Sequence, residues 1–180
     1  MRKMPGEIAK TMCDAGFDAV PMETDLSSRE SIRQTIAAAE QYGSIQMLVN
    51  AAGVSPSQAS VETILRVDLY GTAMLLEEMR THIAEGGVGV TISSQSGFRM
   101  PQLTAEEDAL LAETPAEELL SLEMLQPGQI RDTLHAYQLA KRCNEKRVMA
   151  EAVHWGERGA RINAIAPGII VTPVSYTHLT

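Results

Sequence analysis

The sequence has few cysteines, few positive charges and no long apolar run. Only two cysteines, Cys13 and Cys143, occur among 180 residues, and neither belongs to a C-x-x-C motif or a histidine–cysteine cluster. This spacing disfavours a disulfide scaffold and a metal site such as zinc, and it is typical of a reducing, cytoplasmic setting. No stretch approaches the roughly 18 apolar residues of a membrane-spanning helix. The basic start has no apolar continuation, so it is not typical of a signal peptide.

The scarcity of positive charge limits the partners that the chain is expected to bind. Lysine and arginine total 15 against 23 acidic residues, which gives a formal net charge of −8. This balance argues against nucleic acid and against an anionic membrane surface as partners. Apolar residues make up 44% of the chain, a normal share for a globular protein, and the length suffices for one domain with a core.

Helix and strand patterns alternate along the chain, which predicts a parallel sheet with helices on its faces. Pro5 and Gly16 suit the start and end of a first helix, Ser27 and Glu30 predict a capping box, and Asp132 suits a helix N-cap. The expected helices cover residues 5–16, 27–43, 61–85 and 132–158. The expected strands cover residues 18–24, 45–50, 88–94 and 161–166.

Residues 100–131 interrupt this alternation. Thr104 with Glu107, and Thr114 with Glu117, predict two capping boxes and therefore two short helices. The stretch holds seven carboxylates and no lysine or arginine before its last residue. Two interpretations remain open for it: a solvated acidic face, or a lid over a substrate pocket.

Short turns of polar and small residues follow each expected strand at its carboxyl end. In open parallel sheets, ligands bind at this edge, so four such turns predict one continuous site along it. The turns are Asp25-Leu26, Asn50-Ala51-Ala52-Gly53, Ser93-Ser94 and Pro167-Gly168.

Tyr137 and Lys141 stand four positions apart, which places them on one face of the last expected helix. A phenol has a pKa of about 10, too high for a base near neutral pH. A nearby ammonium group lowers that pKa, and the tyrosine can then exchange a proton with a substrate hydroxyl or carbonyl. The pair alone is equally compatible with a surface tyrosine and lysine on an amphipathic helix.

Taken together and in order, these segments resemble the short-chain dehydrogenase/reductase family. The resemblance covers residues 5–173 and also rests on Y-Q-L-A-K at 137–141 and N-A-I-A-P-G at 163–168. It implies an α/β fold, a Rossmann-like doubly wound parallel sheet. It further implies an enzyme that transfers a hydride between NAD or NADP and a small-molecule secondary alcohol or ketone. The alternative is an inactive, truncated, non-enzymatic relative. A homo-oligomer is compatible with either.

The resemblance also implies roles for single residues. Tyr137 is the expected general acid/base, Lys141 lowers its pKa and binds the nicotinamide ribose, and Ser94, rather than Ser93 or Ser96, binds the substrate oxygen. Asp68 replaces the family's asparagine near a proton-relay water, and a carboxylate there is able to pair with Lys141. Asp25 with Leu26 is expected at the adenine. The other expected cofactor contacts are Asn50, Ala51, Ala52 and Gly53 on the adenine-ribose side, and Pro167, Gly168 and Thr172 near the nicotinamide and pyrophosphate.

The sequence departs from the family because it contains no G-x-x-x-G-x-G turn. We therefore expect a fragment: residues 1–173 as a partial dinucleotide-binding domain with the insertion 100–131, and a tail at 174–180 that does not match. The first strand–helix–strand unit and the C-terminal elements are expected to be missing. In the family's strand order, 3-2-1-4-5-6-7, the strand at 45–50 then becomes an edge. The choice between NAD and NADP stays open.

Overall fold

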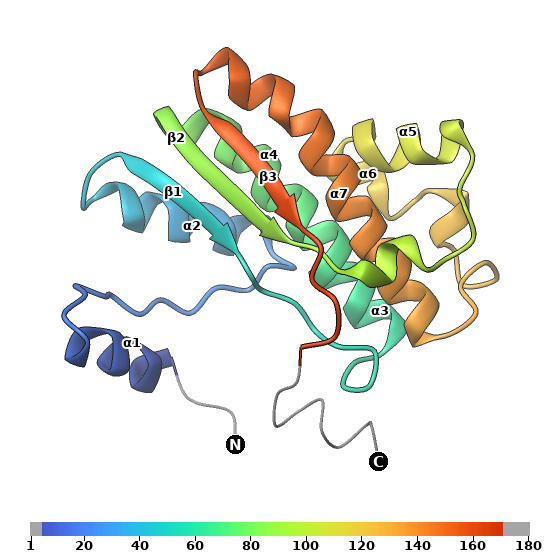
Figure 1. The fold of residues 1–180 in the computed structure, drawn as a ribbon, viewed down its shortest axis with the longest axis horizontal. Helices are drawn as coiled ribbons and strands as arrows, with labels where there is room; N and C mark the ends of the chain where they lie inside the picture. The colour runs from blue at the N-terminus through green and yellow to red at the C-terminus, as the bar shows by residue number, and fades with distance from the viewer. Residues whose placement is uncertain (1–4, 171–180) are drawn as a thin grey trace.

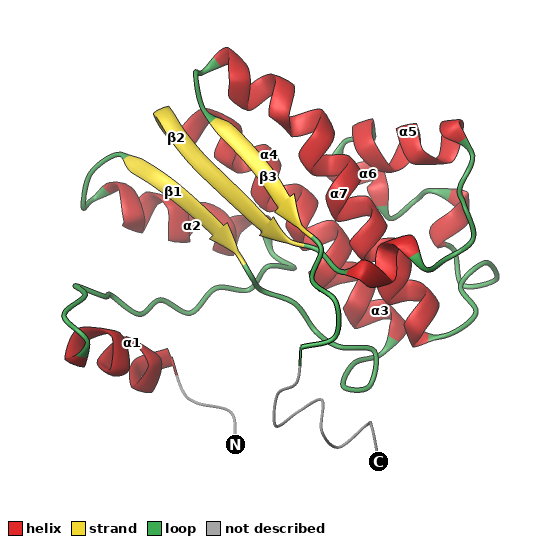
Figure 2. Ribbon diagram, viewed as in Figure 1, coloured by secondary structure: helices red, strands yellow, loops and turns green. Residues whose placement is uncertain are grey.

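The computed structural model describes residues 5–170, which form a three-stranded sheet with helices packed against it (Figures 1 and 2). The strands are β1 (Ile45–Asn50), β2 (Ile83–Ile92) and β3 (Arg161–Ile165). All are parallel, and their order is β1-β2-β3. The expectation of a parallel α/β sheet is confirmed, and within the described residues β1 is an edge strand, as the family order implies.

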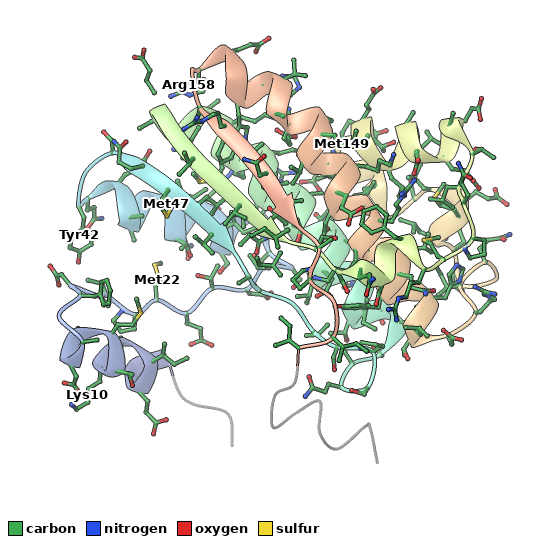
Figure 3. All side chains as sticks on the ribbon, viewed as in Figure 1. Lys10, Met22, Tyr42, Met47, Met149 and Arg158 are labelled. Carbon is green, nitrogen blue, oxygen red and sulfur yellow. The ribbon has the colours of Figure 1, made fainter. Side chains whose placement is uncertain are left out.

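The strand expected at residues 18–24 is not formed. This segment runs without pairing to any described strand, and Val20 and Met22 on it are exposed. In Figure 3, Met22 projects toward Met47 on the edge strand β1, which is also exposed. A strand needs a neighbouring strand to satisfy its backbone hydrogen-bonding groups, and no described strand pairs with this segment, which lies beside α2 instead. The local pattern of apolar residues was therefore insufficient to make a strand here.

Two helices begin and end close to the expected signals. The helix α1 (Pro5–Asp14) ends before Gly16, whose φ is +91°, and α7 (Thr133–Glu157) ends before Gly159, whose φ is +70°. Asp132 caps α7, because its Oδ1 accepts from the His135 N–H at 2.7 Å.

The N-terminal cap of α2 (Arg29–Glu40) differs from the expectation by one residue. The Ser28 hydroxyl accepts from the Ser31 N–H, whereas Ser27 donates to Asp25. The expected capping box of Ser27 and Glu30 is therefore wrong. Ser28 takes the cap position because Ser27 is held in the turn with Asp25.

The long helix expected over residues 61–85 is divided into three parts and ends early. It comprises α3 (Val61–Ile64), a π-helical segment η1 (Leu65–Gly71) and α4 (Thr72–His82). The strand β2 then begins at Ile83, before the expected start at residue 88. Its register against β1 shifts between the pairs Ile45–Ile83 and Met47–Val88, so Gly86 and Gly87, which follow the expected helix, lie in a bulge of the strand.

The main core lies between the sheet and the helices α2, α4 and α7, which are on one side of it (Figure 1). Gly89 in β2 packs directly on Trp155 of α7, because a Cβ on this glycine would lie 2.7 Å from the indole ring. On the other face of the sheet, Met47, Val49 and Ile165 are exposed. Within the described residues, helices thus cover only one face of the sheet. Among these helices, none is long and apolar enough to cross a membrane.

The insertion at residues 100–131 is packed onto the rest of the domain. It contains α5 (Ala105–Glu113), α6 (Ala116–Leu119) and η3 (Glu123–Leu125), and it follows a short 3-10 turn, η2 (Gln95–Phe98). The first expected capping box, Thr104 with Glu107, is present. The second is wrong, because the Ala116 N–H donates to Glu77 of α4 at 2.8 Å and Thr114 makes no side-chain cap. The insertion contributes buried side chains to the core: Leu111, Ala116, Leu119 and Leu125.

Ion pairs fasten the same insertion to the neighbouring helices. Asp108 pairs with Arg142 at 2.7 Å and with Lys146 at 2.8 Å, both on α7. Glu117 pairs with Arg29 at 2.6 Å and accepts a hydrogen bond from Tyr70 at 3.1 Å. The insertion is therefore not a wholly solvated acidic face, because it joins α2, α4 and α7. That it also forms a lid over a substrate pocket stays a prediction.

Candidate active site

Three of the four expected turns lie at the carboxyl edge of the sheet, toward which the strand arrows in Figure 2 point. Asn50 ends β1, the Ser93–Ser94 turn follows β2, and Pro167 follows β3. The loops are tied together there, because the Ser93 N–H donates to Ile165 O at 2.8 Å and the Gln95 N–H donates to Pro167 O at 2.9 Å.

The fourth turn, Asp25-Leu26, does not follow a strand but still reaches the helix behind this edge. The Leu26 backbone lies so close to Gly71 that a Cβ on the glycine would be 2.6 Å from Leu26 O. Asp25 is exposed, and hydrogen bonds from the side chain and backbone of Ser27 hold the pKa of its carboxyl below the usual value. Its carboxylate is therefore charged and accessible at neutral pH.

Ser94 and Tyr137 meet although 43 positions separate them. The hydroxyl group of Ser94 lies close enough to that of Tyr137 to lower its pKa, and both side chains are half-buried. Ser94 is also the N-cap of η2, where its Oγ accepts from the Ser96 N–H at 3.1 Å. Ser96 thus contributes only its backbone N–H to this cap. The hydroxyls of Ser94 and Tyr137 form a half-buried polar pair at the edge of the sheet.

Lys141 lies one turn further along α7 and is buried. Its ammonium nitrogen is 5.4 Å from the centre of the Tyr137 ring and donates to Ile92 O at 3.3 Å. It also lies 3.9 Å from Asp68 Oδ2. The expectation that Asp68 pairs with Lys141 is confirmed.

Asp68 enters the site from the π-helical segment η1, a distortion that is frequent at functional sites. It is fully buried, and its Oδ1 accepts from the Val54 N–H at 2.8 Å. Gly53 leaves room for the carboxylate, because a Cβ there would lie 3.2 Å from Oδ1. Burial raises the pKa of Asp68, whereas Lys141 and the Val54 N–H lower it, and the balance is a raised pKa.

The pKa of Tyr137 is raised in this structure, whereas the influence expected of Lys141 would lower it. Burial raises the pKa of Tyr137, the hydrogen bond with Ser94 lowers it, and the charge of Asp68 raises it, so that the pKa lies above its usual value. The Lys141 ammonium lies over the Tyr137 ring, 5.4 Å from its centre, and the nearby Asp68 carboxylate offsets part of its charge. The phenol is therefore protonated at neutral pH.

The remaining expected cofactor residues divide into buried and accessible ones. Asn50 is buried and donates to Thr72 Oγ1 at 3.3 Å, which fixes the end of β1. Ala51, Ala52, Gly53 and Gly168 are exposed, and their backbones are free to approach a ligand. Thr172 and the tail at 174–180 lie outside the described residues.

Two features beside the site were not predicted from the sequence: the contact of Ser93 with α7, and the presence of Glu145. Ser93 is buried, and its hydroxyl lies 2.8 Å from Lys141 O and 3.0 Å from Glu145 Oε1. The spacing of Lys141 and Glu145 on one helix face was a signal that could have indicated Glu145. No sequence signal marks the contact of Ser93 with α7, because it joins residues 48 positions apart.

Comparison with known proteins shows which families and proteins this chain is similar to. Residues 2–109 match the family model described as Enoyl-(Acyl carrier protein) reductase. The short-chain dehydrogenase/reductase bsc3 of Alternaria brassicicola is 35% identical over 169 residues, which cover 93% of this chain and 61% of that protein. The 3-alpha-hydroxysteroid dehydrogenase/carbonyl reductase of Comamonas testosteroni is 28% identical over 86% of this chain and 61% of its own length.

A solved structure supports the fold. The crystal structure of 3-alpha-hydroxysteroid dehydrogenase from Pseudomonas sp. B-0831, complexed with NADH, superimposes with a TM-score of 0.69 at 23% identity. The match covers 96% of this chain and 70% of that one. This chain spans about 60% of the length of the curated relatives. Because the family model matches more than half of the chain, and a named relative matches nearly all of it, the chain belongs to the short-chain dehydrogenase/reductase family.

Proposed function

We propose that this chain forms the catalytic part of an NAD(P)-dependent oxidoreductase that interconverts a small secondary alcohol and a ketone. The observation that carries the proposal is the cluster of Ser94, Tyr137, Lys141 and Asp68 at the carboxyl edge of the sheet. Two half-buried hydroxyls beside a buried ion pair suit proton transfer to an oxygen atom. Family membership supports the same chemistry.

In the direction of ketone reduction, the side chains supply orientation and one proton. The Ser94 and Tyr137 hydroxyls bind the carbonyl oxygen, and Tyr137 donates its proton to that oxygen as charge develops there. The raised pKa of Tyr137 keeps the phenol protonated at neutral pH, which is the form that a general acid requires. Lys141 then stabilises the phenolate that remains, because its ammonium group is buried next to the ring.

The residues present fit one part of a nicotinamide cofactor, which supplies the hydride when bound. The Lys141 ammonium has three N–H donors and donates one of them to Ile92 O, so it retains donors for ribose hydroxyls. The exposed backbone at Ala51–Gly53 and the accessible Asp25 suit the adenine-ribose side. The pyrophosphate has no such match, because the sequence lacks the glycine-rich turn with which the family holds it.

Because residues match the ribose parts of the cofactor but not its pyrophosphate, residues 1–180 on their own are predicted to bind the cofactor weakly. We expect a polypeptide of these residues to bind NAD(H) and NADP(H) only at about millimolar concentration, because pyrophosphate contacts normally contribute a large share of dinucleotide affinity. Isothermal titration calorimetry of the monodisperse protein with each dinucleotide measures this. Micromolar affinity would show that other residues hold the pyrophosphate.

Activity is tested in a protein that also includes the segments this chain does not share with its relatives. We define the completed chain as residues 5–170 joined to the parts of the Alternaria brassicicola relative that lie outside the match. We expect the completed chain to consume NADH or NADPH with members of a panel of ketones. We also expect it to form the reduced nicotinamide from NAD+ or NADP+ with members of a panel of secondary alcohols, and the absorbance of the reduced nicotinamide measures both. A folded completed chain that binds cofactor but is inactive on every carbonyl and alcohol would contradict the proposal.

The ion pair predicts a specific pH dependence. Asp68→Asn removes a negative charge that raises the pKa of Tyr137, so that pKa falls. In alcohol oxidation the phenolate accepts the proton, and kcat/KM therefore rises with pH through the pKa of Tyr137. We expect the rise to move to lower pH in Asp68→Asn. Glu113→Gln, which removes an exposed charge on the insertion, is the control. An unchanged profile, or a shift to higher pH, would refute the electrostatic role of Asp68.

A further inference from the structure

Ser93 joins the end of the strand β2 to the part of α7 that carries the proposed catalytic residues. Its side chain is 3% exposed and lies on the sheet face that packs against α7. The hydroxyl oxygen is 2.8 Å from the carbonyl oxygen of Lys141 and 3.0 Å from Oε1 of Glu145. The Ser93 N–H is used separately, by Ile165 O of β3. One residue thus links β2, β3 and α7 directly beside Ser94.

Two further contacts join the same turn of α7 to β2 and the residues that follow it, but neither is equivalent to that of Ser93. The Lys141 ammonium donates to Ile92 O, and this group is itself part of the proposed mechanism. The α-carbon of Gly97 packs on the helix backbone, because a Cβ there would lie 2.9 Å from Arg142 N. The Ser93 hydroxyl is therefore a polar contact between the end of β2 and this turn that takes no part in the chemistry, whereas Asp108 of the insertion holds Arg142 and Lys146 from another side.

Glu145 provides a second acceptor for the Ser93 hydroxyl. A serine hydroxyl has one proton and cannot donate fully to two acceptors at once. The Ser93 hydroxyl therefore shares its proton between two acceptors, the Lys141 carbonyl oxygen and Oε1 of Glu145. In this arrangement each of the three groups has a partner.

We propose that Ser93 and Glu145 are positioning residues that hold the Tyr137–Lys141 turn of α7 at a fixed distance from Ser94. The proposal rests on the proposed function, since the distance matters only if these hydroxyls act on one substrate oxygen. Misplacement of reacting groups by about 1 Å can reduce a rate by about 100-fold. A small movement of α7 relative to β2 is therefore sufficient for a kinetic effect.

The kinetic test compares two substitutions on the same face of β2 in the completed chain. Ser93→Ala is expected to lower kcat by about ten-fold or more while KM for the ketone stays within about two-fold, because positioning is lost rather than binding. Thr91→Val is the matched control, because the buried Thr91 hydroxyl has no hydrogen-bond partner in the structure. Ser93→Thr retains the hydroxyl and is expected to restore most of kcat. The effects of Ser93→Ala and Glu145→Ala are expected to be non-additive.

A second measurement does not depend on activity. Hydrogen exchange of residues 1–180, followed by mass spectrometry, is expected to be faster at residues 137–146 in Ser93→Ala than in Thr91→Val. If the two variants exchange equally there, the proposed contact does not hold α7. If they differ in exchange but have equal kcat, Ser93 is structural only and the positioning role is refuted. If the completed chain folds and binds cofactor but is inactive, the proposed function is refuted, and the positioning role is refuted with it. The hydrogen-exchange result would still show whether the Ser93 contact holds α7.

Discussion

Replacing Tyr137 with phenylalanine is expected to lower kcat for ketone reduction by the completed chain by about 10²–10⁴-fold, the usual contribution of a general acid. The substitution removes only the phenol oxygen, so the ring that packs near Lys141 remains. Cofactor affinity is expected to change little, because the buried ammonium group keeps its contact with Ile92 O. Steady-state kinetics with a reactive ketone, together with a fluorescence titration of the reduced cofactor, measure the two effects.

Tyr42→Phe is the matched control for this experiment. Tyr42 is 76% exposed and lies just before the edge strand, away from the Ser94–Tyr137 pair, so its loss of a hydroxyl is expected to leave kcat unchanged. A Tyr137→Phe variant that retains activity within a few-fold of the unsubstituted protein would show that another group donates the proton. Ser94→Ala then becomes the informative variant, because the Ser94 hydroxyl interacts with that of Tyr137.

The largest effect on stability is expected at Arg147. This α7 side chain is 1% exposed, donates to Thr114 O of the insertion and pairs with Glu77 at 3.5 Å. Arg147→Ala leaves the Thr114 carbonyl without its donor and opens a space in the core. We expect the free energy of unfolding of residues 1–180 to fall by about 3 kcal/mol, a typical cost of breaking a buried ion pair from one side. Urea denaturation followed by circular dichroism measures it.

Two further variants separate the causes of that loss. Arg66→Ala removes an exposed i,i+4 pair with Glu62 and is expected to change the free energy of unfolding by no more than about 0.5 kcal/mol. Arg147→Met retains most of the side-chain volume but none of the donors, so it measures the polar contribution alone. Equal stabilities of Arg147→Ala and Arg66→Ala would mean that the insertion does not brace α7 against α4.

Local sequence signals determined a large part of the fold. Asp132 and Gly159 mark the two ends of α7, and the apolar run at 45–50 forms β1 with the expected bounds. These features depend on neighbours within a few residues: a cap accepts from an N–H three positions on, and a glycine accepts positive φ. The spacing of Tyr137 and Lys141 likewise fixes their common helix face. The resemblance to the family also indicated that Ser94 and Tyr137 meet.

Other features depended on residues far apart in the chain, and only the tertiary structure decided them. The segment at 18–24 is not a strand, because pairing needs a neighbouring strand that its own pattern does not supply. The Ala116 N–H is capped by Glu77 of α4 rather than by Thr114. The pKa of Tyr137 is raised rather than lowered, because burial and Asp68 outweigh its hydrogen bond with Ser94. Sequence patterns specify short-range hydrogen bonds, whereas burial and the placement of charges depend on how the whole chain packs.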